Sequence, residues 1–491
     1  MSMDLQDRAA SIQPIKSALK MKILDDSDIR SIDETALRIL EEVGVSMPLE
    51  KALKIFADNG ANVDFDRQLV KIPADLVKKS MAMAPRSFIL AGRDRQELDL
   101  KIDGVTGTYF SCGGGAANTI DIATLQRRSA LKIDTANQAR VADYLPYISL
   151  IYPTTSAGDY RSTLHELEAA MLNTEKHVAA ETVVGETDSQ NALRIAEVIA
   201  GGKEALRKRP LLSAVICVVS PLAFVKDALE SIFVYAEAGI PINIQPMPTM
   251  SMTAPASQAG ALAQGLAEVL SGIVLIQLIN PGTPSIASIL PAVINPRTGD
   301  YHYSGPFSEV TNAAGIQLAH HYNIPSHSGA SFGGSAEGLN QWQVGKENVY
   351  LPFLAVMMGA ELSYSMGLIE AVNLYHPPRI LYDGEIHRHI DIMTRGIEVN
   401  DETLVFETIQ ETGPRGTYLD KVHTAQHVRE FWPDSILFNS SMDPEQKYKD
   451  PTESAWKQIH WILDNHYVPE LDPKMKTEIK KIIEAAEKEM G

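Results

Sequence analysis

The segment IPSHSGASFGGSAEGLNQW, residues 324–342, combines His327 and Phe332 with four glycines in the ten residues 329–338. Glycine loses the most backbone entropy when it is fixed, so a helix or a strand interior rarely carries so many. Such a segment is typical of a loop in which the backbone turns sharply or comes close to a ligand. We therefore interpret Gly333 and its neighbours as part of a binding loop.

One interpretation of this loop is a phosphate site built from backbone N–H groups, which often follows the seventh and eighth strands of an α/β barrel. Against it, residues 324–342 contain no lysine or arginine. A structural interpretation also exists for the two side chains. In that case Phe332 packs in the core and His327 is satisfied by its neighbours.

Other familiar catalytic sites are missing from the sequence. His423 and His427 are spaced for one helix face, but Thr424 stands where zinc proteases have a glutamate. Cys112 and Cys217 have no neighbours at metal-ligand spacing and are more typical of core cysteines. Neither a GxSxG motif nor a P-loop is present. We expect no metal, and a reaction whose reactive centre comes from another molecule.

From residue 108 onward, short β-rich runs alternate with long helical segments. The runs begin near residues 108, 149, 177, 211, 241, 285, 324 and 362. Alternating βα units predict a parallel sheet, and eight of them over roughly 260 residues predict a (β/α)8 TIM barrel. An open, doubly wound sheet is the rival, but CGGGAAN at 112–118 lacks the GxGxxG spacing of that fold.

Chemistry in such a barrel belongs to the C-terminal ends of the strands. The side chains near these ends are Tyr109, Phe110, Asp159, Tyr160, Glu181, Thr182, Cys217, Gln245, His327, Phe332 and Tyr364. None is a lysine, which argues against a Schiff-base aldolase or lyase acting on a phosphorylated sugar. Around the barrel, residues 105–375, we expect an α+β cap at 1–104 and a helical C-terminal extension at 376–491 packed on the barrel.

The composition excludes several classes of protein. The chain has 44 basic and 62 acidic residues, a formal charge of −18, and no basic cluster, which disfavours a nucleic-acid binder or an anionic membrane surface. Only two cysteines are present, and the N-terminus has no apolar segment of the secretory kind. We expect a cytoplasmic protein.

Several stretches resemble the trimethylamine methyltransferase family, in its branch without pyrrolysine. They are LRILEEVGV, VKIPADLVKKSMAMAPRSFILAGRD, GGGAANTIDIATLQRRSALKIDTANQARVADYLPYI, the block from SHSGASFGGS to SMGLIEA, and DKVHTAQHVREFWPDS. The resemblance implies a barrel that moves a methyl group from a methylamine to the cobalt of a separate corrinoid protein. The trimethylamine enzymes carry pyrrolysine near the segment that matches 328–334, where this chain has ordinary residues. Glu337-Gly338 also departs from the more basic segment expected in those enzymes.

The branch without pyrrolysine resembles demethylases of quaternary amines. The resemblance therefore implies glycine betaine as methyl donor and dimethylglycine as product, with proline betaine or carnitine as alternatives. Aromatic faces hold such cations well, and we expect Phe332 and Tyr109 in this role, with loop amides and His327 on the carboxylate. The other expected contacts are Phe110, Glu181, Gln245, Gly333 and Tyr364.

The resemblance also implies that no cofactor is tightly bound, because the corrinoid arrives on its own protein. We expect the chain to form a homo-oligomer. A betaine-binding protein without chemistry remains the non-enzyme alternative.

Overall fold

The computed structural model describes residues 8–155, 158–160, 162–329, 341–428, 430 and 451–490. Eight parallel strands form one sheet in the order β14-β12-β11-β10-β9-β6-β18-β17. A parallel bridge between Ala287 of β14 and Ser326, beside β17, joins the two edges of this sheet. The chain is therefore a closed (β/α)8 barrel, as the alternation of its segments predicts.

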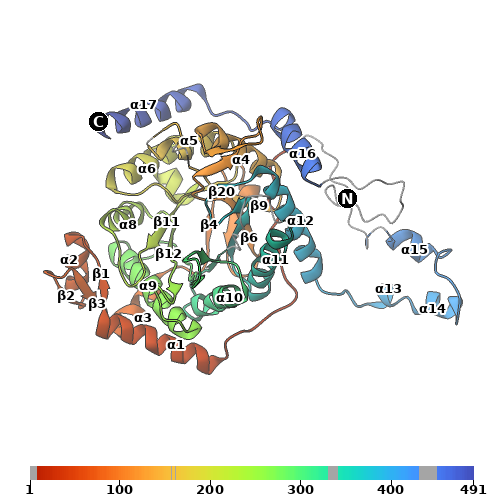
Figure 1. Cartoon of the computed structure of the whole chain (residues 1–491), viewed down its shortest axis with the longest axis horizontal. Helices are drawn as coiled ribbons and strands as arrows, with labels where there is room; N and C mark the ends of the chain where they lie inside the picture. The colour runs from red at the N-terminus through yellow and green to blue at the C-terminus, as the bar shows by residue number, and fades with distance from the viewer. Residues whose placement is uncertain are drawn as a thin grey trace.

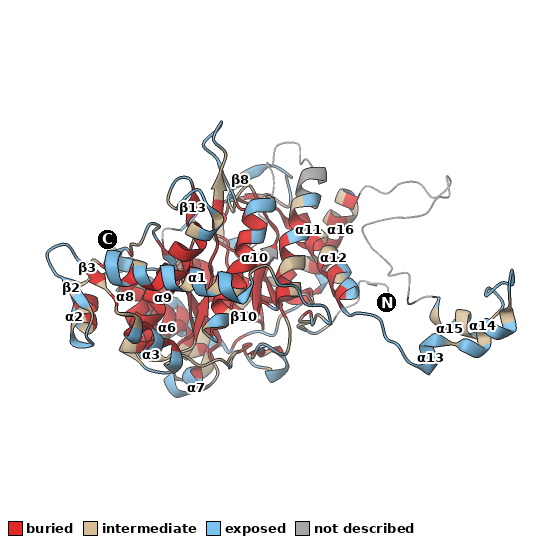
Figure 2. Ribbon diagram, turned by 90° about the horizontal axis from the view of Figure 1, so that it is seen from below, coloured by how far each residue is buried: buried red, intermediate tan, exposed pale blue. Residues whose placement is uncertain are grey.

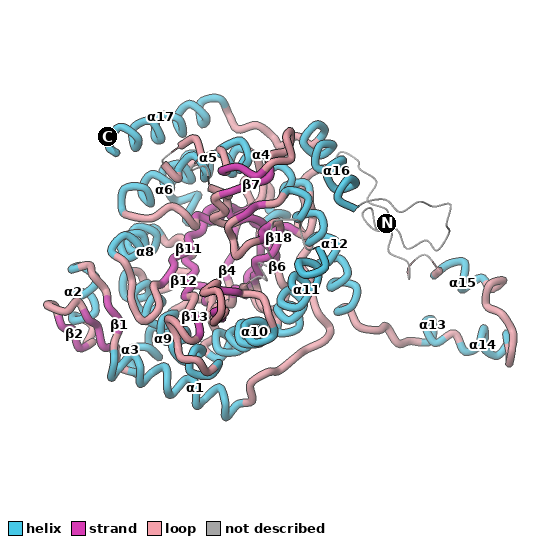
Figure 3. The backbone as a smooth tube through the Cα atoms, in the orientation of Figure 1, coloured by secondary structure: helices cyan, strands magenta, loops and turns pink. Residues whose placement is uncertain are grey.

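Each barrel strand falls within one of the eight β-rich runs of the sequence. The strands are β6 (Tyr109–Gly113), β9 (Ile148–Tyr152), β10 (His177–Ala180), β11 (Leu212–Val218), β12 (Ile242–Pro246), β14 (Ser285–Ala287), β17 (His327–Ser328) and β18 (Leu362–Met366). Figures 1 and 3 look along the barrel and show the strands enclosed by a ring of helices. The ring consists of α4 (Lys132–Tyr144), α5 (Leu164–Leu172), α6 (Glu186–Ala200), α8 (Lys226–Ala238), α9 (Gln258–Ile279), α10 (Pro306–His321), α11 (Gln341–Met358) and α12 (Pro377–Thr394), with the short α7 (Lys203–Lys208) after α6. Because α12 packs on β18, the ring continues beyond residue 375, where the sequence placed the end of the barrel.

Side chains of the strands alternate between the barrel interior and the layer under the helices. On β6, Tyr109 belongs to the interior cluster with Leu150 and Val215. Its neighbour Phe110 belongs to the larger cluster between strands and helices. One helix of the described chain, α9, is long and apolar enough to cross a membrane, and 89% of its apolar window is buried inside the protein. Helices α1, α3, α8 and α10 cover it.

The N-terminal region packs around the barrel and closes its N-terminal end. It contains α1 (Asp26–Arg38), a π-helical turn (Ile39–Val43), β1 (Val45–Ser46), α2 (Glu50–Asp58), β2 (Asn62–Asp64), β3 (Leu69–Lys71), α3 (Ala74–Met83), and a hairpin of β4 (Phe88–Leu90) and β5 (Leu100–Ile102) around a 3-10 turn (Gln96–Leu98). Asp25 and Asp28 form a capping box at the start of α1, and Gly44, with φ of +90°, follows the π-helical turn. The hairpin fills the barrel end, since the Lys101 amide donates to the Tyr109 hydroxyl over 3.0 Å.

Two small sheets stand at the C-terminal mouth of the barrel. One contains β19 (Leu368–Ile369), β20 (Leu374–Tyr375), β7 (Asn118–Ile120) and β8 (Arg127–Ser129), and the other β13 (Thr249–Met250), β15 (Ala292–Ile294) and β16 (Tyr301–His302). Figure 2 shows β8 and β13 projecting at the upper side of the barrel, away from α3 and α7. These sheets deepen the mouth beyond the strand ends.

The C-terminal region divides into two parts. Helix α16 (Pro451–Asn465) packs on α4 and α12, and α17 (Pro473–Met490) packs on α5 and α6. The short helices α13 (Asp401–Leu404), α14 (Phe406–Thr412) and α15 (Val422–His427) extend away from the body (Figures 1 and 2). The sequence predicts helices throughout this region but not this division.

Candidate functional site

A cavity of about 190 Å³ lies at the C-terminal mouth of the barrel. A cavity of roughly 150 Å³ holds a benzene molecule, so this volume suits one small organic molecule. Its walls come from strand ends and from the two mouth sheets. The lining residues are Gly113, Gly114, Glu181, Gln245, Met247, Leu290, Tyr303, Tyr364, Leu368 and Val372.

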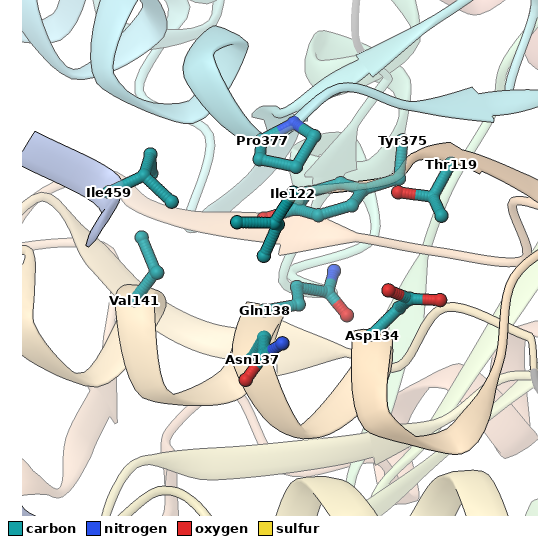
Figure 4. Close-up of a pocket in the computed structure, with 9 residues that line it drawn as sticks. All are labelled: Thr119, Ile122, Asp134, Asn137, Gln138, Val141, Tyr375, Pro377 and Ile459. Carbon is teal, nitrogen blue, oxygen red and sulfur yellow. The ribbon is translucent and has the colours of Figure 1, made fainter. Parts of the chain in front are cut away.

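A second hollow, between α4, α16 and the β7–β20 pair, is structural (Figure 4). Its volume of about 10 Å³ is about that of a single water probe. Gln138 lines it and secures the end of β9, because its amide nitrogen donates to the Tyr152 carbonyl at 3.3 Å and its oxygen accepts from the Thr154 amide at 3.0 Å. This hollow therefore helps to position the mouth without holding a ligand.

Glu181 is the acidic group of the mouth cavity and follows directly on β10. Burial raises the pKa of its carboxyl to about 7, although a hydrogen bond with the Tyr364 side chain lowers it, and nearby Glu166 adds to the increase. Among the described residues, its Oε2 has no hydrogen-bond partner. Gly114, with φ of +120°, makes room for it, since a Cβ at this position would lie 2.8 Å from Oε2. The carboxyl can therefore meet a cation or a hydrogen-bond donor in the cavity.

Tyrosine rings form the wall beside Glu181. The Tyr364 hydroxyl donates to the Gln245 Oε1 over 3.0 Å, which fixes the ring at the end of β18. The ring centroid of Tyr364 lies 4.6 Å from that of Tyr152 on β9. Burial raises the pKa of both phenols, so both hydroxyls stay neutral. Such a wall offers π-faces to a cation without adding a charge.

His327 lies beside this wall and is buried. Its ring centroid is 4.1 Å from that of Tyr364. The Asn243 side-chain nitrogen lies 2.9 Å from Nδ1, and Ser288 donates to the Asn243 oxygen over 2.8 Å. Nδ1 therefore accepts, which puts the ring proton on Nε2. Burial lowers the pKa of the imidazole to about 3, so His327 is neutral. Within the described chain, Nε2 has no partner.

Cys217 is in register with Gln245 on the neighbouring strand. It is exposed to solvent, yet enclosure by the protein, followed by the nearby Glu181 charge, raises the pKa of its thiol to about 12. Both observations fit a side chain that is accessible but surrounded by protein in a deep mouth. The thiol is protonated at neutral pH, so it is a poor nucleophile.

The structure brings together four of the expected contacts. Glu181, Gln245 and Tyr364 line the cavity, and His327 lies against Tyr364. Two others do not reach it. Tyr109 points inward but lies at the opposite end of the barrel, where its hydroxyl accepts from the β5 hairpin. Phe110 points outward, and its ring meets His387 of α12 at 4.1 Å.

The remaining expected positions lie elsewhere. Phe332 and Gly333 lie outside the described residues, so their contact with a ligand stays a prediction. Tyr160 stacks on His165 at 3.8 Å, and Asp159 accepts from the Lys132 amide. Thr182 donates to Glu166.

The sequence interpretation missed several residues of the site. Tyr152, Met247, Leu290, Tyr303, Leu368, Val372 and Asn243 were not among the candidates. For Asn243 a signal existed, because INIQP alternates apolar residues with Asn243 and Gln245, which predicts two polar side chains on one face of β12. The others come from irregular mouth segments or from ordinary strand residues, which carry no periodic signal.

Two further observations bear on the chemistry. Lys176 is buried and its pKa is lowered to about 7 by burial, but it lies at the N-terminal end of β10 and donates to the carbonyls of Ala142, Leu145 and Ile148 at 2.8, 2.7 and 2.6 Å. It is not at the mouth, where a Schiff base would form. Across the described ranges, no group of three or more His, Cys, Asp or Glu side chains is placed to hold a metal ion.

Comparison with known proteins gives a family match over residues 3–491, to the family model described as trimethylamine methyltransferase. The chain is 32% identical to a trimethylamine methyltransferase of Desulfitobacterium hafniense (strain DSM 10664 / DCB-2), over 95% of this chain and 94% of that protein. It is 29% identical to a glycine betaine methyltransferase of Desulfitobacterium hafniense (strain Y51), over 96% and 98%. The crystal structure of the Methanosarcina barkeri monomethylamine methyltransferase has the same fold, with a TM-score of 0.51 and 13% identity over 92% of this chain and 97% of that one.

Proposed function

Because the chain belongs to the trimethylamine methyltransferase family and is therefore a methyltransferase, we propose that its methyl donor is a small quaternary amine, glycine betaine. The acceptor in this proposal is the Co(I) of a separate corrinoid protein, and the product is dimethylglycine. The mouth cavity carries the proposal, since it sets Glu181 and tyrosine rings around a space for one small molecule. We also propose that the reaction takes place in the cytoplasm.

The chemistry of a quaternary amine suits this site. When the methyl carbon accepts the electron pair of Co(I), the carbon–nitrogen bond breaks and its electrons stay on nitrogen. The amine leaves neutral and needs no proton, so the enzyme has to position the two reactants and exclude water. The buried His327 and tyrosine hydroxyls stay neutral, and Glu181, with a pKa of about 7, is not needed as an acid or base in this reaction.

Recognition of glycine betaine would use both ends of the molecule. The ammonium group would lie against Tyr364 and Tyr303, with each aromatic face contributing roughly 0.5–2 kcal/mol, and ionised Glu181 would add an attractive charge. The carboxylate would accept from the Nε2–H of His327 and, as the sequence predicts, from backbone amides around Gly333. Proline betaine and carnitine present the same two groups, so both are alternative donors in this proposal.

Trimethylamine is the second candidate, because the relative that is 32% identical is named for it. One feature favours the betaine. Residues 328–334 of this chain are all standard amino acids. The resemblance implies that the trimethylamine enzymes carry pyrrolysine in the matching segment. A glycine betaine methyltransferase covers this chain as fully as the trimethylamine enzymes do, so coverage does not separate the two donors.

Product analysis tests the proposal. The enzyme, a reduced corrinoid protein and one amine at a time are incubated, and the demethylated product is identified by mass spectrometry. Glycine betaine should give dimethylglycine. Choline, which lacks the carboxylate, should be bound at least tenfold more weakly, because buried donors would be left unpaired. Equal use of choline would contradict the two-ended recognition.

A further inference from the structure

Residues 395–428 form an exposed arm that carries α13, α14 and α15. None of these residues is buried, and Figures 1 and 2 show the arm extending away from the barrel. Ile397 and Leu419 are 91% and 90% exposed. The other exposed large apolar side chains of the arm are Val399, Leu404, Phe406, Ile409, Tyr418, Val422 and Val428. A soluble protein rarely leaves so many apolar side chains together in water unless another surface covers them.

The helices of the arm are also too short to be stable by themselves. Its three helices have 4, 7 and 6 residues, whereas isolated helices shorter than about 12–15 residues are marginal in water. Their stability must come from packing of their apolar side chains. The arm therefore requires a docking surface.

A groove of about 460 Å³ at the N-terminal end of the barrel has the matching chemistry. One side of the groove is the segment 15–21, and the other is the end of α11 with Gly359. Leu19, Met21 and Val105 present apolar surface there and are largely exposed. The groove is accessible and combines these apolar side chains with polar and basic ones.

The charges of the two surfaces are opposite. Lys16 and Lys20 line the groove and have no ion-pair partner among the described residues. Arg86 and His320 also line it, but Glu361 beneath them lies 2.7 Å from Arg86 and 3.0 Å from His320. The arm contains six acidic and three basic residues, a net charge of −3. The acidic, apolar arm thus matches the basic groups and the apolar side chains of the groove.

The arm leaves the body beside the groove. The Ala18 amide donates to the Thr394 carbonyl over 2.7 Å, and a Cβ on Gly396 would lie 3.2 Å from that of Ala18. A two-fold axis at this point would set each arm against the groove of the other copy, and a two-fold interface is reciprocal by symmetry. We propose that two copies of the chain exchange arms in this way, each arm lying in the groove of its partner.

A second copy fits better than the corrinoid protein as the occupant. The methyl acceptor has to reach the cavity at the C-terminal mouth, whereas the groove lies beside Thr108 and Gly359, at the N-terminal ends of β6 and β18. Docking at the groove would leave a methyl acceptor at the wrong end of the barrel. The exchange therefore concerns assembly and leaves the mouth free.

Cross-linking with mixed isotopes tests the exchange directly. Unlabelled and ¹⁵N-labelled full-length chains are mixed at low concentration, concentrated and treated with an amine cross-linker, and native mass spectrometry checks that mixed particles have formed. Links between Lys421 of the arm and Lys16 or Lys20 should join a labelled to an unlabelled peptide. Links within one isotope alone would mean that the arm folds onto its own groove and would overturn the proposal, as would the absence of these links.

Sedimentation of variants provides the second test. Phe406→Ser with Leu419→Ser on the arm, or Lys16→Glu with Lys20→Glu in the groove, should halve the particle mass of the wild type. Phe65→Ser, which changes an exposed aromatic residue on the N-terminal region, is the matched control and should leave the mass unchanged. Circular dichroism should show the same helix content in the body of each variant. An unchanged mass in both arm and groove variants would refute the exchange.

Discussion

At the scale of single residues, the buried Glu181 carboxylate lowers the stability of the fold and, in the proposed function, attracts the cationic methyl donor. Burial raises its pKa from 4.5 to about 7. Between these two values the unfolded chain has released the proton and the native protein still holds it, so the free energy of unfolding falls as the pH rises through this range. The loss is complete above pH 7. At about 1.4 kcal/mol per pKa unit, its upper limit is about 3 kcal/mol.

Glu181→Gln should therefore make the protein more stable and less able to bind its donor. Above pH 7 we expect a gain of about 1–3 kcal/mol in the free energy of unfolding, and no gain below the unfolded pKa. Urea unfolding at pH values on both sides of this range measures the difference. A variant that is destabilised at every pH would show that the carboxylate has a purely structural task.

The same carboxyl predicts a pH dependence of binding. Its charge is present above pH 7 and is lost as the pH falls, so the affinity of the wild type for glycine betaine should decrease below pH 7. Glu181→Gln should bind roughly tenfold more weakly above pH 7, which corresponds to about 1.4 kcal/mol, and its affinity should not vary with pH. Calorimetric titration of both proteins decides this. If the affinities of the wild type and of Glu181→Gln changed with pH in the same way, Glu181 would not be the group that attracts the cation.

Two substitutions of Tyr364 separate the contribution of its ring to betaine binding from that of its hydroxyl. Tyr364→Ala removes a π-face of about 1–2 kcal/mol and should weaken betaine binding by roughly tenfold or more. Tyr364→Phe keeps the ring and should have a much smaller effect. Tyr109→Phe is the control at the opposite end of the barrel and should leave the affinity unchanged, although it loses a hydrogen bond to the β5 hairpin. If all three variants bound equally well, the tyrosine wall would not hold the cation.

At the scale of elements, the turn after β6 decides how much room Glu181 has. Gly115, with φ of +53°, lies in the left-handed region, where alanine is strained by about 1–2 kcal/mol, and Gly114, with φ of +120°, lies outside this region, where alanine is strained more. Only Gly114→Ala puts a Cβ 2.8 Å from the Glu181 carboxylate; nothing lies within 4 Å of a Cβ at Gly115. Gly114→Ala should lose more stability than Gly115→Ala, and only Gly114→Ala should lose methyl transfer, by tenfold or more. Equal activities would show that the turn does not shape the site.

The elements of the fold were predictable because each βα unit repeats the same pattern. Eight β-rich runs between helical segments correspond to the eight strands, and their order around the barrel follows. The orientation of side chains was harder to predict. The pair Tyr109-Phe110 is apolar on both faces of β6, so alternation alone does not say which ring points inward. Neither ring reaches the mouth, because both lie at the start of the strand rather than at its end.

The cavity itself was only partly predictable. Glu181, Gln245 and Tyr364 were found because strand ends in a barrel are marked by the sequence pattern. Tyr303 and Met247 come from segments between a strand and the following helix, and their position depends on the mouth sheets. The exposure of the arm was equally hidden, since its sequence has the helical character of the packed helices α16 and α17.

At the scale of the whole molecule, the two ends of the barrel have separate tasks in this account. The C-terminal mouth holds the methyl donor and faces the methyl acceptor, and the N-terminal end holds the groove for a second copy. Arm and groove variants should therefore keep their affinity for glycine betaine while their mass changes. Calorimetry on the sedimentation samples checks this, and a parallel loss of affinity would show that the two ends are coupled.

The most direct test of the central claim is methyl transfer to cobalt. The enzyme is mixed with a corrinoid protein reduced to Co(I), and glycine betaine or trimethylamine is added while the absorbance spectrum is recorded. The account predicts that methyl-cobalt forms with glycine betaine, that the rate falls at least tenfold in Tyr364→Ala, and that trimethylamine gives no comparable rate. Transfer from trimethylamine as fast as from glycine betaine, or no transfer from any quaternary amine, would contradict it.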